Sequence, residues 1–378
     1  GGAVRSWPRG WGRHRLVRRR LAVGQAVLFH APHTRANPQR GPILPDFDIA
    51  IDDLRVDRLV LAKPVLGTPR VGRIAGRADI RDGRALVRLG AVVAGTDRLA
   101  VRIDAAPDRD RFDIDVRAAG AATGVLARAL GVRRAVRLDV DGKGSWTHWR
   151  GRAVGRIGGG RAVDLALAAD AGRYTLGGEV ATAGWTSAVV QRLTSPRVRI
   201  AGSATFADRR LDGTLSLRST ALAMTTTGVI DLGTSAWRNV RIEARLLRPA
   251  AVIPTMSGSG VVLRAVLDGG FRTALFDYRL RADQLAIDRT GMRGVRLAGS
   301  GRLGGRVLTM PTRFVAAEVT GVGDVAGGIL RNLSLDGPVR LTGSLLTADA
   351  LRLRSDKLDG RIMVSLDLAT GRDRKSVV

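Results

Sequence analysis

The chain has 378 residues, 45% of them hydrophobic, which excludes a disordered chain and allows a substantial core. Its 62 Lys and Arg against 34 Asp and Glu give a net charge of +28, but aromatic residues make up only 4%. Nearly all the basic residues are arginines spread along the chain, whereas a nucleic-acid surface needs clustered charge and stacking aromatics, so we expect no nucleic-acid partner. The absence of Cys excludes disulfides, thiolate metal sites and a cysteine nucleophile.

Residues 1–41 differ from the rest of the chain. The stretch "RSWPRGWGRHRLVRRR" (5–20) shows neither period 2 nor period 3.6, so we predict a basic, irregular segment. The nearest approach to a membrane-spanning helix, "LAVGQAVLF" (21–29), is far shorter than the ~18 apolar residues required. Because the chain begins at Gly1, we expect a membrane anchor or signal upstream of it.

Alternation of apolar and polar residues recurs from residue 42 to residue 370. Four examples are "LRVDRLVL" (54–61), "RFDIDVRA" (111–118), "GTLSLRS" (213–219) and "GRIMVSLDL" (360–368). Gly, Asp or Asn separates such runs at the spacing typical of all-β chains. The pattern predicts an all-β fold, an elongated and curled sheet of short, repeated antiparallel strands, in two regions, 42–185 and 186–370. The tail 371–378 abandons the alternation, and we expect it to be unstructured or non-native.

One segment breaks this pattern. In "ATGVLARALGVRRA" (122–135), Val125, Leu126, Ala129 and Leu130 have helical spacing, and Gly131 is placed to end a helix. We therefore predict a single short helix near residues 122–131, which would cap or plug one end of a sheet.

Asp113 and Asp115 stand two apart in a strand-like run, so both side chains point to one face. Paired carboxylates could share a proton or hold a cation, which would indicate a catalytic or metal site. The same alternation, however, places apolar residues on the opposite face, and similar acidic pairs recur at positions 46/48 and 139/141. Since a catalytic pair would be singular, we interpret Asp113 and Asp115 as part of a solvated strand face.

Two motifs resemble cofactor or metal sites but lack what their chemistry requires. "GSGRLGG" (299–305) has the G-x-G-x-x-G spacing, but no helix follows that would bind a pyrophosphate, so we predict a turn between strands. "DVDGKGSWTHWR" (139–150) begins like a calcium loop, but Lys143 and Arg150 occupy positions that need oxygen ligands, so a hairpin turn is the better interpretation. We expect no metal and no cofactor.

Catalysis also lacks candidate residues. His148 is the one histidine within the alternating region, and no G-x-S-x-G elbow occurs, so we predict that the protein is not an enzyme. Trp146 and Trp149 flank this histidine, and we interpret them as aromatic closure of a sheet edge rather than a platform for a sugar.

Several stretches resemble the TamB family, the inner-membrane component of the bacterial translocation and assembly module. These are "ILPDFDIAIDDLRVDRLVL" (43–61), "GRADIRDGRALV" (76–87), "GVLARALG" (124–131) and "LDVDGKGSWTHWRG" (138–151). Two later stretches, "VRIAGSATFADRRLDGTLSLRS" (198–219) and "VRLTGSLLTADALRLRSDKLDGRIMVSLDL" (339–368), are similar to the hairpin repeats of the wider AsmA-like group. The likeness covers about residues 42–370; it is specific in the first third and only architectural after Trp185.

The resemblance implies a long, curled sheet, or β-taco, whose concave side is an apolar groove. It implies a periplasmic location, with an inner-membrane anchor N-terminal to this chain and a partner outer-membrane barrel protein bound through a segment C-terminal to it. The implied roles are outer-membrane protein assembly or secretion and movement of phospholipid between the two membranes. The family has no catalytic residues, so none is carried over.

The alternation independently predicts sheets that are apolar on one face, and acyl chains would cover such a face. The residues predicted to line the groove are Phe112, Ile114, Val116, Leu138, Val140, Leu215, Leu217, Val240, Ile242, Val339 and Leu341. Two alternatives stay open: a secreted β-solenoid adhesin or glycan-binding protein, and a polyanion-binding protein that uses the net charge of +28.

Overall fold

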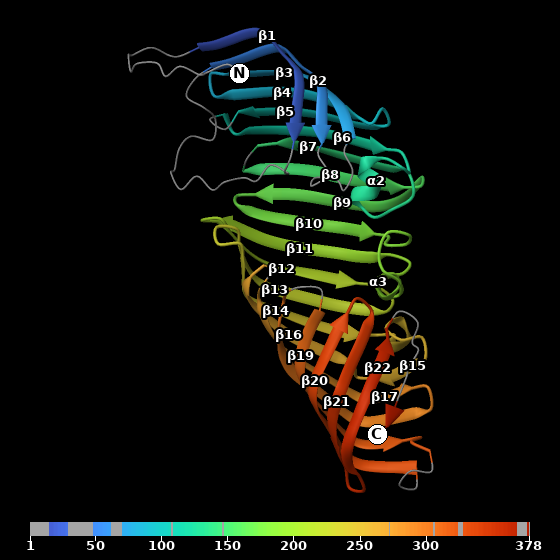
Figure 1. Cartoon of the computed structure of the whole chain (residues 1–378). Helices are drawn as coiled ribbons and strands as arrows, with labels where there is room; N and C mark the ends of the chain where they lie inside the picture. The colour runs from blue at the N-terminus through green and yellow to red at the C-terminus, as the bar shows by residue number, and fades with distance from the viewer. Residues whose placement is uncertain are drawn as a thin grey trace. The chain divides into compact units, whose positions relative to one another are not determined.

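A computed structural model gives the fold of the chain (Figure 1). Strands make up 73% of it and helices 6%, and the strands are mostly antiparallel, so the predicted all-β fold is confirmed. The chain forms two compact units, residues 1–161 (unit 1) and residues 162–378 (unit 2). The structure describes residues 15–28, 48–61, 70–106, 109–145, 147–271, 273–304, 307–323, 328–368 and 376–377.

In unit 1 the sheet follows chain order, and each strand from β1 to β8 pairs with the next. The strands are β1 (Arg15–Leu28), β2 (Asp48–Leu61), β3 (Arg70–Arg81), β4 (Arg84–Val93), β5 (Asp97–Ala106), β6 (Arg111–Gly120), β7 (Val136–Gly144) and β8 (His148–Ile157). Tight turns join several of them. Asp82 and Gly83, with φ of 48° and 69°, form the two-residue turn between β3 and β4, which is the conformation that an Asp-Gly pair favours.

Strand β1 contradicts the prediction of an irregular segment over residues 1–41. Residues 15–28 form a strand that pairs in parallel with β2, and Leu21 and Val23 lie beside Leu54 and Val56. The prediction was wrong there because a strand is held by backbone hydrogen bonds to its neighbour, which a basic and weakly alternating sequence also supplies. The remaining residues up to 41 lie outside the described part of the chain.

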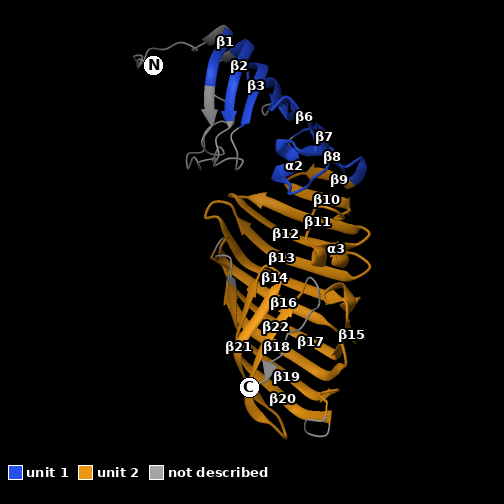
Figure 2. Cartoon of the chain, turned by 45° about the vertical axis from the view of Figure 1, so that its right-hand side comes forward, with its two compact units in different colours: residues 1–161 blue, residues 162–378 orange. Residues whose placement is uncertain are grey.

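In unit 2 the strands again follow one another nearly in chain order (Figure 2). Each strand pairs with the next, except that β15 and β16 both pair with β17, while β14 pairs with β16. The strands are β9 (Gly160–Asp170), β10 (Arg173–Val180), β11 (Val198–Ala207), β12 (Arg210–Arg218), β13 (Leu222–Asp231), β14 (Ala236–Leu246), β15 (Met256–Ser259), β16 (Val262–Gly270), β17 (Leu275–Ile287), β18 (Thr290–Arg302), β19 (Val307–Thr320), β20 (Ile329–Thr342), β21 (Leu345–Arg354), β22 (Asp359–Asp367) and β23 (Ser376–Val377). Apart from the two residues of β23, the tail 371–378 is outside the described residues.

The predicted helix is present as α2 (Val125–Ala129), between β6 and β7. Its Ala127 is fully buried, and the carboxylate of Asp97, on β5, accepts a hydrogen bond from the backbone N–H of Leu126 at 2.7 Å. Asp97 thus satisfies a free donor of the first helical turn from 29 residues away. Gly124 has no room for a side chain because this carboxylate lies against it.

The expectation of one helix was incomplete. The structure adds α3 (Ala188–Thr194), between β10 and β11, and a 3-10 turn, η2 (Pro249–Ala251), after β14. The run that forms α3, "AVVQRLT", is only seven residues long and holds two valines, which favour strands, so its pattern does not distinguish helix from strand.

The sheet of unit 2 curls. Strands β21 and β22 run steeply in front of β14 and β16 in both views (Figures 1 and 2). The Arg192 side chain of α3 donates hydrogen bonds to the carbonyl oxygens of Ala251 at 3.0 Å, Val252 at 2.9 Å and Leu368 at 3.1 Å. One guanidinium therefore joins α3, η2 and the end of β22, and it holds together segments that lie far apart in the sequence.

Candidate functional site: the apolar faces of the two sheets

The register of unit 1 separates apolar from charged side chains. Across β3 to β8, one row of neighbouring residues reads Gly76, Leu89, Val101, Val116, Val140 and Ala153. The adjacent row on the other face reads Arg77, Arg88, Arg102, Asp115, Asp141 and Arg152. The two faces are called here the apolar face and the charged face of unit 1.

All five groove residues that the sequence predicts in unit 1 lie on its apolar face. Ile114 pairs with Ile103, and Val116 lies between Val101 and Val140. Phe112 packs near Trp149, with ring centroids 6.1 Å apart. Leu138 stays 37% exposed, which is high for a leucine next to buried strands.

Trp149 lies near the start of β8, on the apolar face, and pairs with Gly144 at the end of β7. Its indole lies over Gly142 and Gly151, neither of which has room for a side chain. Gly142, the fourth residue of the calcium-like motif, is thus a strand residue of β7 that accommodates a ring. Trp146 is outside the described residues.

Unit 2 carries the same separation over more strands. One row, from β11 through β21 without the short β15, consists of Ile200, Leu217, Met224, Ala244, Leu263, Leu280, Leu297, Phe314, Leu335 and Leu353. All ten are apolar, and each is partly exposed. The parallel row on the opposite face includes exposed arginines at 199, 218, 245, 281, 296 and 354.

The six groove residues predicted in unit 2 also share its apolar face. Leu217 belongs to the ten-residue row, and Leu215 pairs with Thr226, which pairs with Ile242. Leu215, Leu217, Ile242 and Leu341 are partly exposed. Val240 and Val339, only 5% and 7% exposed, are instead packed into the core.

One end of the apolar face of unit 2 is closed by a core cluster. The cluster consists of Val261, directly before β16, and of buried residues of β17 to β20: Ala282, Leu285, Val295, Ala316, Val319, Leu330 and Leu333. Members of the exposed row, such as Leu280, Phe314 and Leu335, pack against this cluster. The apolar side chains are therefore buried at one end of the face, whereas those of the ten-residue row remain partly exposed to solvent.

Two polar side chains, Tyr278 and Thr312, lie on the apolar face next to the row. The hydroxyl groups of Tyr278 and Thr312 are 2.7 Å apart, and Thr312 also donates to the carbonyl of Met310 at 3.0 Å. Gly299 and Gly301 lie under the rings of Tyr278 and Phe276. Gly299 and Gly301 are inside β18, where they make room for aromatic rings, so the predicted turn does not begin there. Leu303 and Gly304, later in the same motif, lie between β18 and β19.

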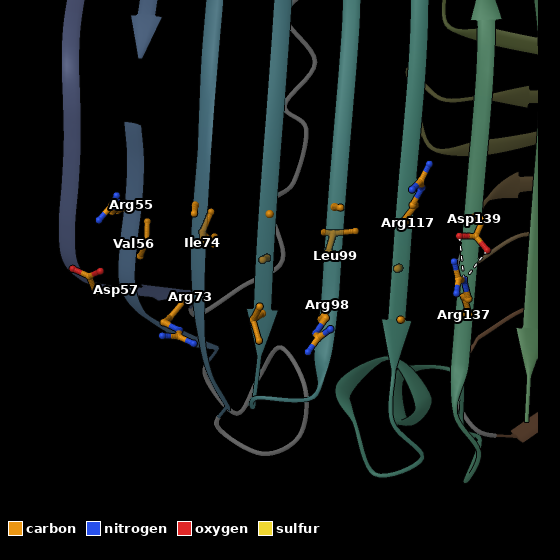
Figure 3. A pocket seen from close by; sticks show the side chains of 17 residues that line it. Arg55, Val56, Asp57, Arg73, Ile74, Arg98, Leu99, Arg117, Arg137 and Asp139 are labelled. Carbon is orange, nitrogen blue, oxygen red and sulfur yellow. Dashed lines mark hydrogen bonds and ion pairs between the residues drawn. The ribbon is translucent and has the colours of Figure 1, made fainter. Parts of the chain in front are cut away.

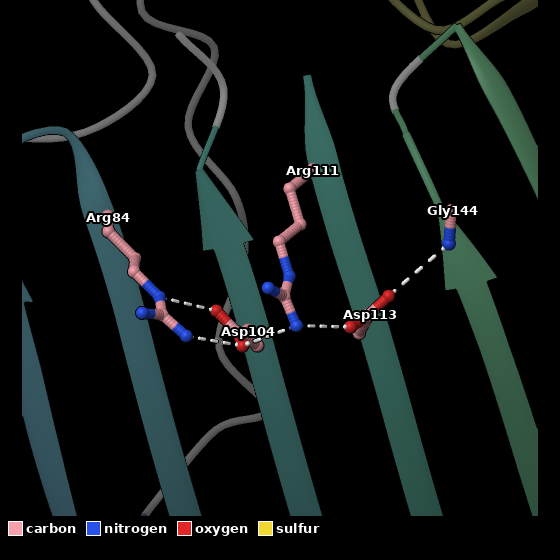
Figure 4. Close-up of polar contacts among 5 residues, drawn as sticks. All are labelled: Arg84, Asp104, Arg111, Asp113 and Gly144. Atoms are coloured by element: carbon pink, nitrogen blue, oxygen red, sulfur yellow. Dashed lines mark hydrogen bonds and ion pairs between the residues drawn. The ribbon is translucent and has the colours of Figure 1, made fainter. Parts of the chain in front are cut away.

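Contacts on the charged face of unit 1 show whether the paired carboxylates Asp113 and Asp115 could form a catalytic or metal site (Figure 4). Asp104 and Asp113 are direct cross-strand neighbours, and Arg111 lies between them at 3.1 Å and 2.9 Å. Arg84 adds a bidentate contact to Asp104 at 2.8 Å and 2.7 Å. The hydrogen bonds from Arg84, more than the burial that opposes them, hold the pKa of Asp104 below its usual range, and the same contact raises the pKa of Arg84.

Asp113 and Asp115 therefore have structural partners. Asp113 binds Arg111 and accepts a hydrogen bond from the backbone N–H of Gly144 at 3.3 Å, and Asp115 binds Arg117 at 3.1 Å. The carboxylates are neutralised by arginines rather than placed to share a proton. Among the residues that the structure describes, no group of acidic and histidine side chains could hold a metal ion, and no helix is long and apolar enough to cross a membrane.

Sequence reasoning missed part of this site. Leu99, 37% exposed, lies between Ala91 and Ala118 on the apolar face, and Leu280 and Phe314 belong to the long row. Their own alternation is visible in the sequence, but their membership in one row depends on the strand register. Comparison with protein-family models, with curated proteins and with solved structures found no match.

Proposed function

We propose that this chain is a non-enzymatic groove protein that holds the acyl chains of phospholipids on its apolar faces. The observation that supports it best is the ten-residue row of unit 2, which is apolar at every position and yet partly exposed. Contiguous exposed apolar surface of this kind marks a binding site in soluble proteins. The opposite face of the same strands carries exposed arginines, so the exposed apolar side chains are confined to one face.

The dimensions suit a lipid. With neighbouring strands about 4.8 Å apart, the row is ~43 Å long, whereas one leaflet occupies about half of the ~30 Å hydrocarbon core of a bilayer. An acyl chain would thus cover only part of the row at a time. The resemblance to the TamB family extends the proposal to phospholipid movement between inner and outer membranes and to assistance of outer-membrane protein assembly.

Site-specific photo-crosslinking in cells tests the groove. A photoreactive residue at position 114 or 217 is expected to form adducts with co-purifying phospholipid, which mass spectrometry identifies. The matched positions 115 and 218 follow directly in the chain but point to the charged faces, so they should give none. Adducts from 115 and 218 without any from 114 and 217 would reverse the faces and remove the proposal.

The location and partner rest on the resemblance alone. We propose a periplasmic position, with an anchor in the inner membrane and an outer-membrane barrel protein as partner. Protease treatment of spheroplasts tests the first, since the full-length protein should be digested only when the outer membrane is opened. Co-purification after crosslinking of the full-length protein tests the second, and recovery without any barrel protein would contradict it.

A further inference from the structure

A hollow of about 630 Å³ lies in unit 1 between β2 and β7 (Figure 3). Its volume is within the range of about 300–1,000 Å³ typical of small-molecule sites. Small residues form its floor, because Ala75, Gly90 and Ala100 are neighbours in one register row across β3, β4 and β5. These three leave a shallow depression among longer side chains.

The hollow belongs to the charged face rather than to the apolar one. The floor row continues into Arg117 and Asp139, and the second lining row contains Arg73, Val92 and Arg98. Of the residues on the apolar face, only the row that contains Ala91 and Leu99 borders the hollow. The next apolar row, which contains Val101 and Val116, does not line it.

The charge of the lining is unbalanced. Arginines at 55, 73, 98, 117 and 137 face two aspartates, Asp57 and Asp139. Three of the arginines have carboxylate partners: Arg55 binds Asp53, Arg117 binds Asp115 and Arg137 binds Asp139, each at 3.0–3.1 Å. Arg73 and Arg98 make no ion pair within the described ranges, and they lie on either side of Val92. Two guanidinium groups are thus available to an anion above a floor without bulky side chains.

We propose that this hollow is a docking site for the phosphate of an anionic phospholipid headgroup at a membrane surface. Arginine binds phosphate oxygens through a planar fork of donors. Arg73 and Arg98, which make no ion pair in the described part of the chain, supply two such forks. The described residues of the lining include no aromatic side chain, so they offer no stacking surface of the kind that single-stranded nucleic acids use. The site is on the charged face of unit 1, and the proposal holds whether or not the apolar faces bind acyl chains.

Vesicle co-sedimentation of the full chain tests the site. Vesicles of phosphatidylcholine with phosphatidylglycerol should bind, and vesicles of phosphatidylcholine alone should not. At about tenfold in affinity per 1.4 kcal/mol and about 1 kcal/mol per arginine near an anionic surface, Arg73→Gln with Arg98→Gln should weaken binding roughly 30-fold. The melting temperature of the variant should match that of the parent, because neither arginine has an ion pair to lose among the residues that the structure describes.

The matched control removes the same charge elsewhere. Arg281 and Arg296 are exposed cross-strand neighbours on the charged face of unit 2, so Arg281→Gln with Arg296→Gln should change binding by less than about threefold if the site is local. Equal weakening by both double variants would mean that net charge alone drives binding, and it would overturn the proposal.

Two further arms identify the source of the phosphate. Inorganic phosphate at low millimolar concentration should not displace the vesicles; displacement with the same dependence on Arg73 and Arg98 would make free phosphate the ligand and refute a membrane site. A DNA oligonucleotide that binds more tightly than the vesicles, and loses binding in Arg73→Gln with Arg98→Gln, would refute it in favour of nucleic acid. Photo-crosslinking from position 217 in the same double variant measures acyl-chain binding in the groove independently of the headgroup site.

Discussion

The apolar faces of the two units follow one alternation but differ in burial. In unit 2 the face closes at one end into a cluster of large side chains, with Val295 1% and Leu330 4% exposed. In unit 1 most of the buried residues on and around the face are alanines, such as Ala105, Ala118 and Ala127, while Leu99 and Leu138 stay 37% exposed. The difference shows that alternation decides which face is apolar, whereas the curl of the sheet decides how much of that face is removed from water.

The largest expected effect separates these two kinds of apolar position. Val295→Asp places an unpaired charge in the core of unit 2 and should lower the free energy of unfolding by more than about 4 kcal/mol. Leu138→Asp, at a partly exposed position of unit 1, should cost only about 1–2 kcal/mol. Urea denaturation of the full chain measures both. Equal losses would mean that the two faces are equally closed.

The next comparison sets the two faces of one strand against each other. Ile114→Asp puts a carboxylate on the apolar face of β6 and should reduce co-purifying phospholipid at least tenfold, because that charge would have to be desolvated beside acyl chains. Asp115→Asn changes a residue of the same strand on the charged face, outside the lining of the hollow, and should leave lipid recovery within about twofold. A greater loss with Asp115→Asn than with Ile114→Asp would contradict the groove.

Asp104→Asn tests the arginine network of the charged face. Loss of the charged hydrogen bonds from Arg84 should cost about 2 kcal/mol of stability at neutral pH. The pKa of Asp104 is lowered in the folded state, so its contribution is complete above the unfolded pKa of about 3.9 and is lost as the pH falls through the folded pKa. The parent and the variant should therefore converge in stability at acidic pH. Asp349→Asn, in an exposed pair with Arg340, is the control and should change stability by less than about 0.5 kcal/mol.

Removal of Arg192 should loosen unit 2 and leave unit 1 unchanged. Arg192→Ala deletes three hydrogen bonds to carbonyl groups and should cost about 1–2 kcal/mol. Amide hydrogen exchange should accelerate in β22 and around η2, while β3 to β7 keep their protection. Arg218→Ala, an exposed arginine on β12, should produce neither change. Unaltered exchange in β22 of the Arg192 variant would mean that the curl does not depend on this side chain.

The smallest effect is expected for the two carboxylates that first suggest a catalytic site. Asp113→Asn together with Asp115→Asn should change stability by no more than about 0.5 kcal/mol each and leave lipid crosslinking at position 217 unaltered, because the ion pairs they make are largely exposed. A severe loss of cellular activity without unfolding would show that these residues have a chemical role.

The sequence predicts the faces well because period-2 alternation acts within a single strand. Phe112, Ile114 and Val116 fall on one face for that reason alone, and the helix at 125–129 is predicted by local spacing and a terminal glycine. Strand β1 and helix α3 escape prediction because each depends on a neighbour, β2 for the first and the η2 and β22 carbonyl groups for the second.

Burial and register could not be predicted either. Val240 and Leu217 read alike as strand residues, yet one is 5% exposed in the core and the other belongs to the partly exposed row. Gly299 and Gly301 have the spacing of a phosphate-binding loop, but in the structure they make room for the rings of Tyr278 and Phe276. In each case the deciding information is the identity of the cross-strand neighbour, and short local patterns do not contain it.

The contact between Arg192 and Leu368 also makes the number of strands in unit 2 a fixed quantity. Duplication of one hairpin, for example β17 and β18, would keep each side chain of the other strands on its present face. It would lengthen the apolar row by roughly 10 Å, since each added strand contributes about 4.8 Å. It would also move the end of β22 away from the guanidinium that now binds it. A hairpin therefore cannot be added or removed in unit 2 without breaking the contact between Arg192 and Leu368.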